Sequence, residues 1–259
     1  MIVKKNRSLG LIFLLAFFLI FWRFNFTDIT GDDGHYSFRA VGLTDWLLSE
    51  AQTTPLHWFT SLPAWTYLSF HDHPLLLFIV QHLFFGLFGV SNFVAKLPYA
   101  LFGLGTIWFT YRWVKNYYTE KIALLSALLL SVSAGFIMLA RRPLMETGVM
   151  FFLALGLYYF TQYLKDQRYW WKLGLALGVL IQVKLTVLFI FPTIISYLCL
   201  QPAFRTNKKI WRQLLGILGI VFIFSIPTLV YELAMLQSRG HFSYQFARLL
   251  GQNSPWQAG

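Results

Sequence analysis

Stretches of apolar residues divide this sequence and constrain its fold more than any other feature. A helix needs about 20 mostly apolar residues to cross the ~30 Å hydrocarbon core of a bilayer. Hydrophobic residues make up 57% of the chain and charged residues only 12%, a composition far from that of a water-soluble domain. We therefore predict an all-α integral membrane protein, a polytopic helical bundle of about seven transmembrane helices. The predicted spans occupy residues 9–22, 97–114, 121–139, 148–164, 173–183, 186–200 and 213–231.

A shorter apolar run lies at residues 75–90. Whether it crosses the membrane decides on which side the basic residues of all later loops lie. Cytoplasmic segments of membrane proteins carry an excess of Lys and Arg. If 75–90 is an interfacial or re-entrant helix on the outer face, beginning at Pro74, most of the 21 basic residues become cytoplasmic, opposed only by Glu120 and Asp166. If 75–90 crosses the membrane, this bias is lost. We therefore expect a cytoplasmic N-terminus and an external loop, about 25–96, with juxtamembrane helices.

No internal repeat or linker divides the sequence into separate domains. We expect one membrane-embedded module over residues 1–231 and an external segment over 232–259. The spans at 173–183 and 186–200 are short and meet at Lys184, so together they resemble an interrupted hairpin. An ionisable residue at such a break is a candidate functional group.

The first group of polar residues in the predicted external segments is Gly31-Asp32-Asp33-Gly34-His35-Tyr36. Adjacent carboxylates raise each other's proton affinity, which suits one of them to act as a general base. The same acids could instead solvate a loop or cap a helix that starts near Tyr36. The spacing alone favours this structural interpretation and leaves the catalytic one open.

The second group is His71-Asp72-His73-Pro74, directly before the 75–90 helix. Two histidines that flank an aspartate could bind a divalent metal ion, but the pattern lacks a third ligand. Helix initiation explains it better, with Asp72 or His73 as the cap and Pro74 in the first turn. His73 could still face a ligand, and whether a metal is used stays open.

The third group is Arg141-Arg142-Pro143-Leu144-Met145-Glu146, between the third and fourth predicted spans. Arginines at a membrane surface often only anchor a helix end. Here, however, they lie on the outer side, against the orientation bias, and Glu146 opens a helix whose N-terminus favours negative charge. Anchoring and a paired-charge site are equally consistent with this pattern.

The order of these groups resembles that of the GT-C glycosyltransferases. More specifically, the chain is similar to glycosyltransferase family 39, which contains protein O-mannosyltransferases and bacterial aminoarabinose lipid A transferases. The resemblance covers essentially the whole chain. Its most specific stretches are GDDGHYSFRA, HDHPLLLFIVQHLFFGLFGVSNFVAKLPYALFG and ARRPLMETGVMFFLALGLYYF.

The resemblance implies roles for several positions. The first acid of the family's external acidic pair, which is implicated in catalysis, falls on Asp32, and the family's following tyrosine falls on Tyr36. Its (His or Lys)-Pro-Pro motif falls on His73 and Pro74, with Leu75 in place of the second proline. Its second-loop acid falls on Glu146. Its Thr-Lys-Gly falls on Val183-Lys184-Leu185, and this departure, like Leu75, bears on donor specificity and metal use. The family also implies a longer chain, of which these residues would be the N-terminal seven-span module.

The resulting hypothesis is a transferase in the cell membrane that takes a sugar from a polyprenyl-phosphate donor and passes it, with inversion, to a lipid, glycan or protein acceptor on the outer face. Asp32 and Glu146 are the predicted catalytic residues. The predicted substrate-binding residues are Asp33, His35, Tyr36, Asp72, His73, Arg141, Arg142 and Lys184. The alternative is a polytopic transporter or flippase-like protein, although such proteins usually have repeat symmetry and paired broken helices. The net charge of +11 is explained by orientation in the membrane rather than by nucleic acid.

Overall fold

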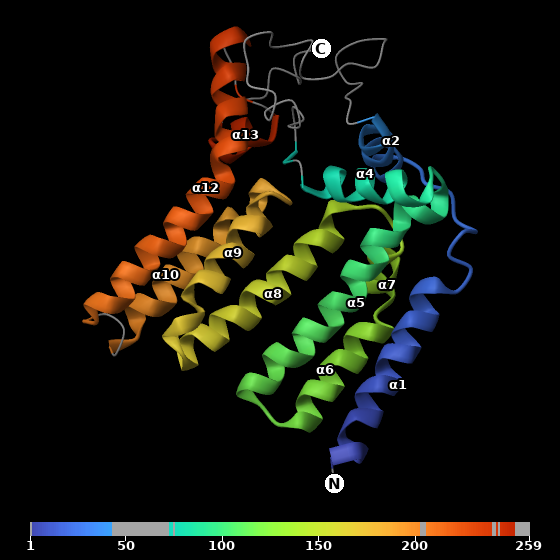
Figure 1. Cartoon of the computed structure of the whole chain (residues 1–259), viewed down its shortest axis with the longest axis horizontal. Helices are drawn as coiled ribbons and strands as arrows, with labels where there is room; N and C mark the ends of the chain where they lie inside the picture. Colours follow the sequence, from blue (N-terminus) through green and yellow to red (C-terminus); the bar gives the residue numbers. More distant parts are fainter. Residues whose placement is uncertain are drawn as a thin grey trace. The chain divides into compact units, whose positions relative to one another are not determined.

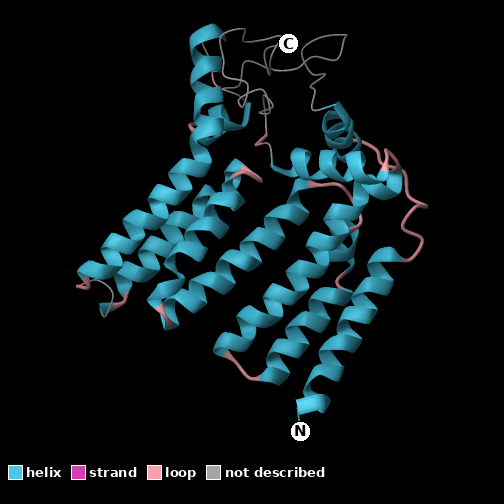
Figure 2. Ribbon diagram, in the orientation of Figure 1, coloured by secondary structure: helices cyan, strands magenta, loops and turns pink. Residues whose placement is uncertain are grey.

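The computed structural model describes residues 2–42, 73–74, 76–202, 206–239, 242 and 244–251, and these form helices joined by short connections (Figures 1 and 2). Within these ranges there is no strand, which confirms the all-α prediction for them. The chain divides into two compact units. The first contains residues 1–42 and 78–169, and the second contains 43–77 and 170–259.

The first unit contains most of the predicted external groups. Its helices are α1 (Ile2–Phe21), α2 (Asp32–Gly42), α4 (Leu76–Phe88, apart from its first two residues), α5 (Asn92–Tyr117), α6 (Glu120–Val132), α7 (Ala134–Ala140) and α8 (Met145–Lys165), followed by a 3₁₀ turn, η2 (Gln167–Tyr169). Helix α5 is central, because α1, α6, α7 and α8 all pack against it. Its neighbours α6 and α8 run beside it (Figure 1).

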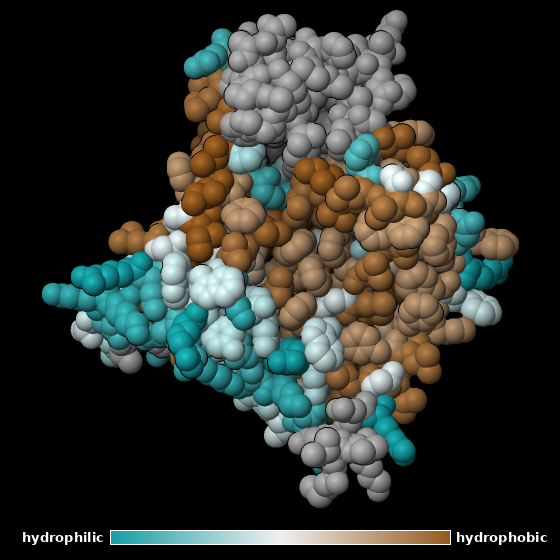
Figure 3. Space-filling view, in the orientation of Figure 1, coloured by the Kyte–Doolittle hydropathy of each residue, from teal (hydrophilic) through white to brown (hydrophobic). Residues whose placement is uncertain are grey.

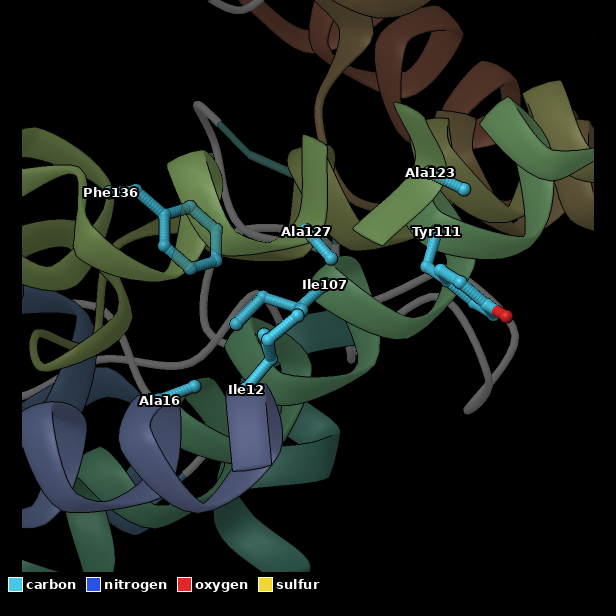
Figure 4. Close-up of a cluster of buried hydrophobic side chains, with 7 residues drawn as sticks. All are labelled: Ile12, Ala16, Ile107, Tyr111, Ala123, Ala127 and Phe136. Atoms are coloured by element: carbon cyan, nitrogen blue, oxygen red, sulfur yellow. The ribbon is translucent and has the colours of Figure 1, made fainter. Parts of the chain in front are cut away.

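An apolar cluster joins α1, α5, α6 and α7 (Figure 4). It consists of Ile12, Ala16, Ile107, Tyr111, Ala123, Ala127 and Phe136. Three of these seven side chains are alanines, and small residues let helices approach closely where lipid gives no hydrophobic drive for association. The outer face of α1 is apolar as well: Leu11 is 67% exposed and Leu14 is 65% exposed. On the face shown in Figure 3, apolar residues also gather over α4 and α5.

Helices α5 and α7 approach each other closely at Gly103. A Cβ atom added at Gly103 of α5 would lie 2.7 Å from the Cβ of Ala140, the last residue of α7. Only a glycine fits there without a shift of one helix. Because Arg141 and Arg142 follow Ala140 directly, this contact also fixes where the two arginines leave the bundle.

Helix α4 runs across the end of α5 rather than beside it (Figure 1). It has 13 residues, a length of ~20 Å at 1.5 Å per residue, against ~30 Å for the hydrocarbon core of a bilayer. The helix begins at Leu76, two residues after the predicted start at Pro74. That residues 75–90 do not cross the membrane stays a prediction.

Every predicted span forms helix over most of its length. In the described part of the chain, three helices are long and apolar enough to cross a membrane, fewer than the seven predicted: Asn92–Tyr117, Met145–Lys165 and Lys208–Val230. A fourth candidate is the pair α6 and α7, which is bent by 67° at a break. The break lies at Ser133, whose hydroxyl accepts a hydrogen bond from the backbone N–H of Phe136 at 3.5 Å and so caps α7. Shorter apolar helices occupy Arg7–Phe21 and Leu185–Leu200.

The second unit is built around a long helix. Its helices are α9 (Trp170–Ile181), the 3₁₀ helix η3 (Leu185–Phe189), α10 (Ile190–Leu200), α12 (Lys208–Arg239) and α13 (Tyr244–Leu249). Helices α9 and α12 pack through Gly174 and Gly178, where added Cβ atoms would lie 2.9 Å from Ile220 and 2.8 Å from Phe224. The chain leaves helical geometry between Ile181 and Leu185, which confirms the predicted break at Lys184.

Candidate active site

The acidic pair lies in the first turn of α2. Gly31 has a left-handed backbone, with φ of 70°, and the helix begins at Asp32, four residues before the predicted start near Tyr36. The acids are thus part of the helix, where its dipole favours negative charge, instead of preceding it. Their environments differ: Asp33 is 1% exposed, whereas Asp32 is exposed to solvent.

Asp33 is bound by Arg142. The Nε of Arg142 donates to Asp33 Oδ2 at 2.8 Å and its Nη2 donates to Oδ1 at 3.0 Å, a two-point contact. Nη2 also donates to the carbonyl of Thr30 at 3.3 Å. The hydrogen bond to Asp33 raises the pKa of Arg142, and the charges of Asp33 and Asp32 add to this. Arg142 thus joins the turn between α7 and α8 to the start of α2. That Arg141 or Arg142 also lies close to Glu146 stays a prediction.

Arg141, the neighbouring cation, binds backbone oxygens. Its Nη1 donates to the carbonyl of Leu19 and its Nη2 to that of Arg23, both at 3.3 Å. These carbonyls lie at the C-terminal end of α1, where the last carbonyls of a helix lack helical partners and a cation is favourable. Among the described contacts of Arg141 there is no ion pair, so none of them neutralises its charge.

Lys96 is a site residue that the sequence interpretation missed. It lies in the second turn of α5 and is 1% exposed. Its Nζ donates to the carbonyl of Phe24 at 3.2 Å, to the hydroxyl of Thr27 at 3.1 Å and to the carbonyl of Thr27. A lysine near the end of an apolar run resembles a surface anchor, but its burial shows that the side chain points into the protein interior.

Polar side chains on α4 hold the other side of α2. Gln81, also missed, is fully buried and its Nε2 donates to Ser37 Oγ and to the carbonyl of Ala95, both at 2.9 Å. The ring Nδ1 of His82 lies 2.8 Å from the carbonyl of Ala40. The sequence does contain a signal for Gln81, because it is a glutamine inside the apolar run 75–90. A buried amide needs hydrogen-bond partners, so this residue could have been expected to bind another segment.

His35 and Tyr36, two predicted substrate-binding residues, lie on α2. Tyr36 packs edge-on against Phe78 of α4, with ring centroids 5.9 Å apart. The rings of His35 and Tyr36 are 6.5 Å apart. These two residues of α2 therefore lie next to the acids in the first unit, as expected from the sequence.

Glu146 lies in the first turn of α8 and is half-buried. The next residue, Thr147, is fully buried and donates its hydroxyl to the carbonyl of Leu139 at 2.7 Å, which ties the start of α8 to α7. Glu146 is thus in the same unit as Asp32 and follows Arg142 by four residues. A shared cavity for Asp32 and Glu146 remains a prediction.

The remaining predicted residues belong to the second unit. His73 is buried, and Lys184 ends the turn before η3. The backbone N–H of Leu76 donates to the carbonyl of Gln182 at 3.2 Å, which joins the start of α4 to that turn. Asp72 lies outside the described residues. No group of three or more His, Cys, Asp or Glu side chains able to hold a metal occurs in the described part of the chain.

Residues 72–231 match the sequence profile of a family described as dolichyl-phosphate-mannose-protein mannosyltransferase. The chain belongs to this family. The matched segment of the mannosyltransferase family includes Lys96, Arg141, Arg142, Glu146 and Lys184, whereas Asp32 and Asp33 lie before it. The family assignment agrees with the resemblance found in the sequence motifs.

One protein sequence and one solved structure are also similar to this chain of the mannosyltransferase family. The "Putative mannosyltransferase YycA" of Bacillus subtilis (strain 168) is 24% identical over 149 residues, which are 56% of this chain and 22% of that protein. The crystal structure of ArnT from Cupriavidus metallidurans in the apo state superposes with a TM-score of 0.64 over 93% of this chain and 43% of ArnT, at 14% identity. This similarity concerns the fold. The chain spans less than half the length of either relative.

Proposed function

We propose that this chain carries the catalytic membrane module of a glycosyltransferase that takes its sugar from a polyprenyl-phosphate donor and transfers it to an acceptor on the outer face of the membrane. Family membership supports the reaction class, and the ArnT-like fold agrees with it. The proposal includes seven membrane passages, a cytoplasmic N-terminus and α2 and α4 on the outer surface. The acceptor is a lipid, glycan or protein hydroxyl or amine.

The observation that carries the proposal is the difference in burial and contacts between the two adjacent acids, Asp32 and Asp33. Asp33 is buried and holds Arg142 with both oxygens, so its lone pairs are engaged in the structure of the site. Asp32, one residue earlier, is exposed at the same helix start. A general base must be able to reach its substrate, which only the exposed acid of the pair can do. The site therefore offers one structural carboxylate and one available for chemistry.

The proposed reaction is a single displacement at the anomeric carbon. Asp32 accepts the proton of the acceptor as the acceptor's oxygen or nitrogen attacks that carbon. The bond between the anomeric carbon and the donor's phosphate oxygen breaks, and polyprenyl phosphate leaves with the bonding electrons. One displacement inverts the configuration. Because negative charge builds on the leaving oxygen, nearby cations should stabilise the transition state.

The described contacts rank the first-unit cations for this role. Arg142 is already paired with Asp33, so much of its charge is compensated. Arg141 binds only neutral carbonyls in its described contacts and is half-buried, so its charge is better able to act on a phosphate. In the second unit, Lys184 and His73 remain proposed donor-binding residues. Glu146, Tyr36 and His35 remain proposed to contact sugar or acceptor, and Asp72 remains a proposed binding residue.

The test uses membranes that contain the full-length protein and tritiated undecaprenyl-phosphate mannose. We expect transfer of label, and Asp32→Asn should lower the rate by ~10²–10⁴-fold, the usual worth of a general base. Asp28→Asn is the matched control, because Asp28 is also exposed and lies on the same connection. A near-wild-type rate for Asp32→Asn would remove Asp32 from the mechanism. No transfer by wild-type membranes from mannose, glucose or aminoarabinose donors would overturn the donor class.

A further inference from the structure

Three cations converge on the connection between α1 and α2, residues 22–31, which leads to the acidic pair. Lys96 reaches it from α5, whereas Arg141 and Arg142 reach it from the turn between α7 and α8. In the connection they bind the backbone carbonyls of Arg23, Phe24, Thr27 and Thr30, and Arg141 also binds the carbonyl of Leu19 in the last turn of α1. Cations thus bind carbonyls spread along the whole length of the connection.

The connection has little structure of its own. It contains turns over residues 22–27, and the described backbone bonds there are those of Trp22, Phe24 and Phe26 to earlier carbonyls. Residues 28–30 are not helical. Since a segment of this kind has no regular hydrogen-bond ladder, its shape depends on side chains that bind its backbone. Lys96 and Arg142 provide these contacts at Thr27 and Thr30.

We infer that Lys96 is a positioning residue, whose buried ammonium holds the connection so that Asp32 is presented to substrate. The inference rests on the proposed function, because it assigns Lys96 an effect only through Asp32. An ammonium has three N–H donors, and here they meet three oxygens of Phe24 and Thr27. Thr27 precedes Asp32 by five residues, so a movement of the connection at Thr27 is transmitted to the start of α2.

Direct binding of the donor phosphate is a less suitable role for Lys96. The side chain is 1% exposed, and its donors are engaged by the connection. To bind a phosphate, it would have to leave the oxygens of Thr27. A buried ammonium is costly compared with an apolar side chain of similar size, and the cost is explained if the three contacts are needed to fix a geometry.

The test compares Lys96→Met with Lys96→Arg in membranes containing the full-length protein. Displacing a catalytic group by about 1 Å can cost ~10²-fold in rate, so Lys96→Met should lower kcat by about that factor. The KM for undecaprenyl-phosphate mannose should stay near the wild-type value, since no substrate contact is removed. Lys96→Arg keeps a cation with several donors and should recover most of the rate. Lys121→Met, which removes an exposed lysine at the start of α6, is the matched control and should match wild type.

A double variant separates positioning from other roles. If Lys96 acts through Asp32, then Lys96→Met should cause little further loss in an Asp32→Asn background. Additive losses, or a large rise in KM with unchanged kcat, would show that Lys96 acts on substrate instead and would overturn the inference. If Asp32→Asn alone is harmless, the proposed function fails. If Asp32→Asn is crippling and Lys96→Met is harmless, only the positioning role fails.

A milder variant covers the case in which Lys96→Met does not fold. Thr27→Val removes one of the three oxygens that bind the ammonium and keeps the shape of the side chain. It should lower kcat severalfold without changing the melting temperature, and amide hydrogen exchange over residues 22–31 should become faster. Wild-type kcat and exchange in a folded Thr27→Val protein, together with an inactive Lys96→Arg protein, would contradict the role.

Discussion

Asp33 and Arg142 form a two-point ion pair in which the aspartate side chain is 1% exposed and the arginine side chain is 38% exposed. The pair joins the start of α2 to the turn between α7 and α8, two segments separated by more than a hundred positions in the sequence. It also gives the two adjacent acids different tasks, because Asp33 is engaged and Asp32 is not. Removing either partner should therefore affect the structure, whereas removing Asp32 should affect mainly the chemistry.

The first prediction concerns this ion pair. Asp33→Asn removes the charge that Arg142 faces and should destabilise the protein by about 1.5–3 kcal/mol, the range for hydrogen bonds to charged groups. Asp32→Asn should cost less, up to ~1 kcal/mol, because it removes only the favourable interaction of an exposed acid with the helix dipole. Thermal unfolding of the two variants in the same detergent measures the difference. Equal melting temperatures would show that the ion pair contributes nothing to the fold, and Asp33 would then lose its structural assignment.

The second prediction concerns the contact of α5 with α7. Gly103→Ala places a methyl group 2.7 Å from the Cβ of Ala140, so the helices must separate and Arg141 and Arg142 must move with α7. Both stability and transfer rate should fall. Gly135→Ala on α7 is the control, because no atom lies within 4 Å of its added Cβ, and alanine should stabilise that helix by up to ~1 kcal/mol. Similar behaviour of the two variants would contradict the close contact.

The third prediction concerns topology. A cysteine at Asn92, exposed at the start of α5, should react with an impermeant thiol reagent in intact cells, whereas cysteines at Lys121 and Lys209 should react only after permeabilisation. Lys96 itself is unsuitable for labelling because it is buried. The native Cys199 is replaced by serine in this experiment. Labelling of position 121 but not 92 would mean that α4 crosses the membrane and would reverse the orientation of the site.

Much of the fold could be predicted because an apolar run is read from neighbouring residues alone. The bias of basic residues toward one side of the membrane is likewise a simple sum over the loops. Each of the seven predicted runs is helical, and the breaks near residues 140–147 and at Lys184 are where the pattern placed them. The count of seven spans stays a prediction, since apolar length alone does not show that Ser133 caps a new helix at a 67° bend. A single serine in an apolar run is compatible with both arrangements.

The site was predicted in part, and the reason lies in long-range pairing. Asp32, Asp33, Arg141 and Arg142 were selected from their types and order, but the ion pair of Arg142 with Asp33 was not foreseen, because Glu146, four residues away, is an equally plausible partner in the sequence. Nothing local distinguishes these two acids as partners. Lys96 was missed because a lysine near a helix start usually reaches for the membrane surface, and its burial depends on a connection more than 60 positions earlier.

Helix α5 contacts both the connection that leads to the acids and the end of α7, which the arginines follow. Lys96 ties the acid-bearing connection to α5, and Gly103, two turns further on, receives the end of the helix that bears the arginines. When bilayer thickness changes, a spanning helix adapts by tilting. A tilt of α5 would move acids and arginines together and leave their separation unchanged. The rate of transfer should accordingly vary little among bilayers of different acyl-chain length, and Gly103→Ala should make it sensitive to that length.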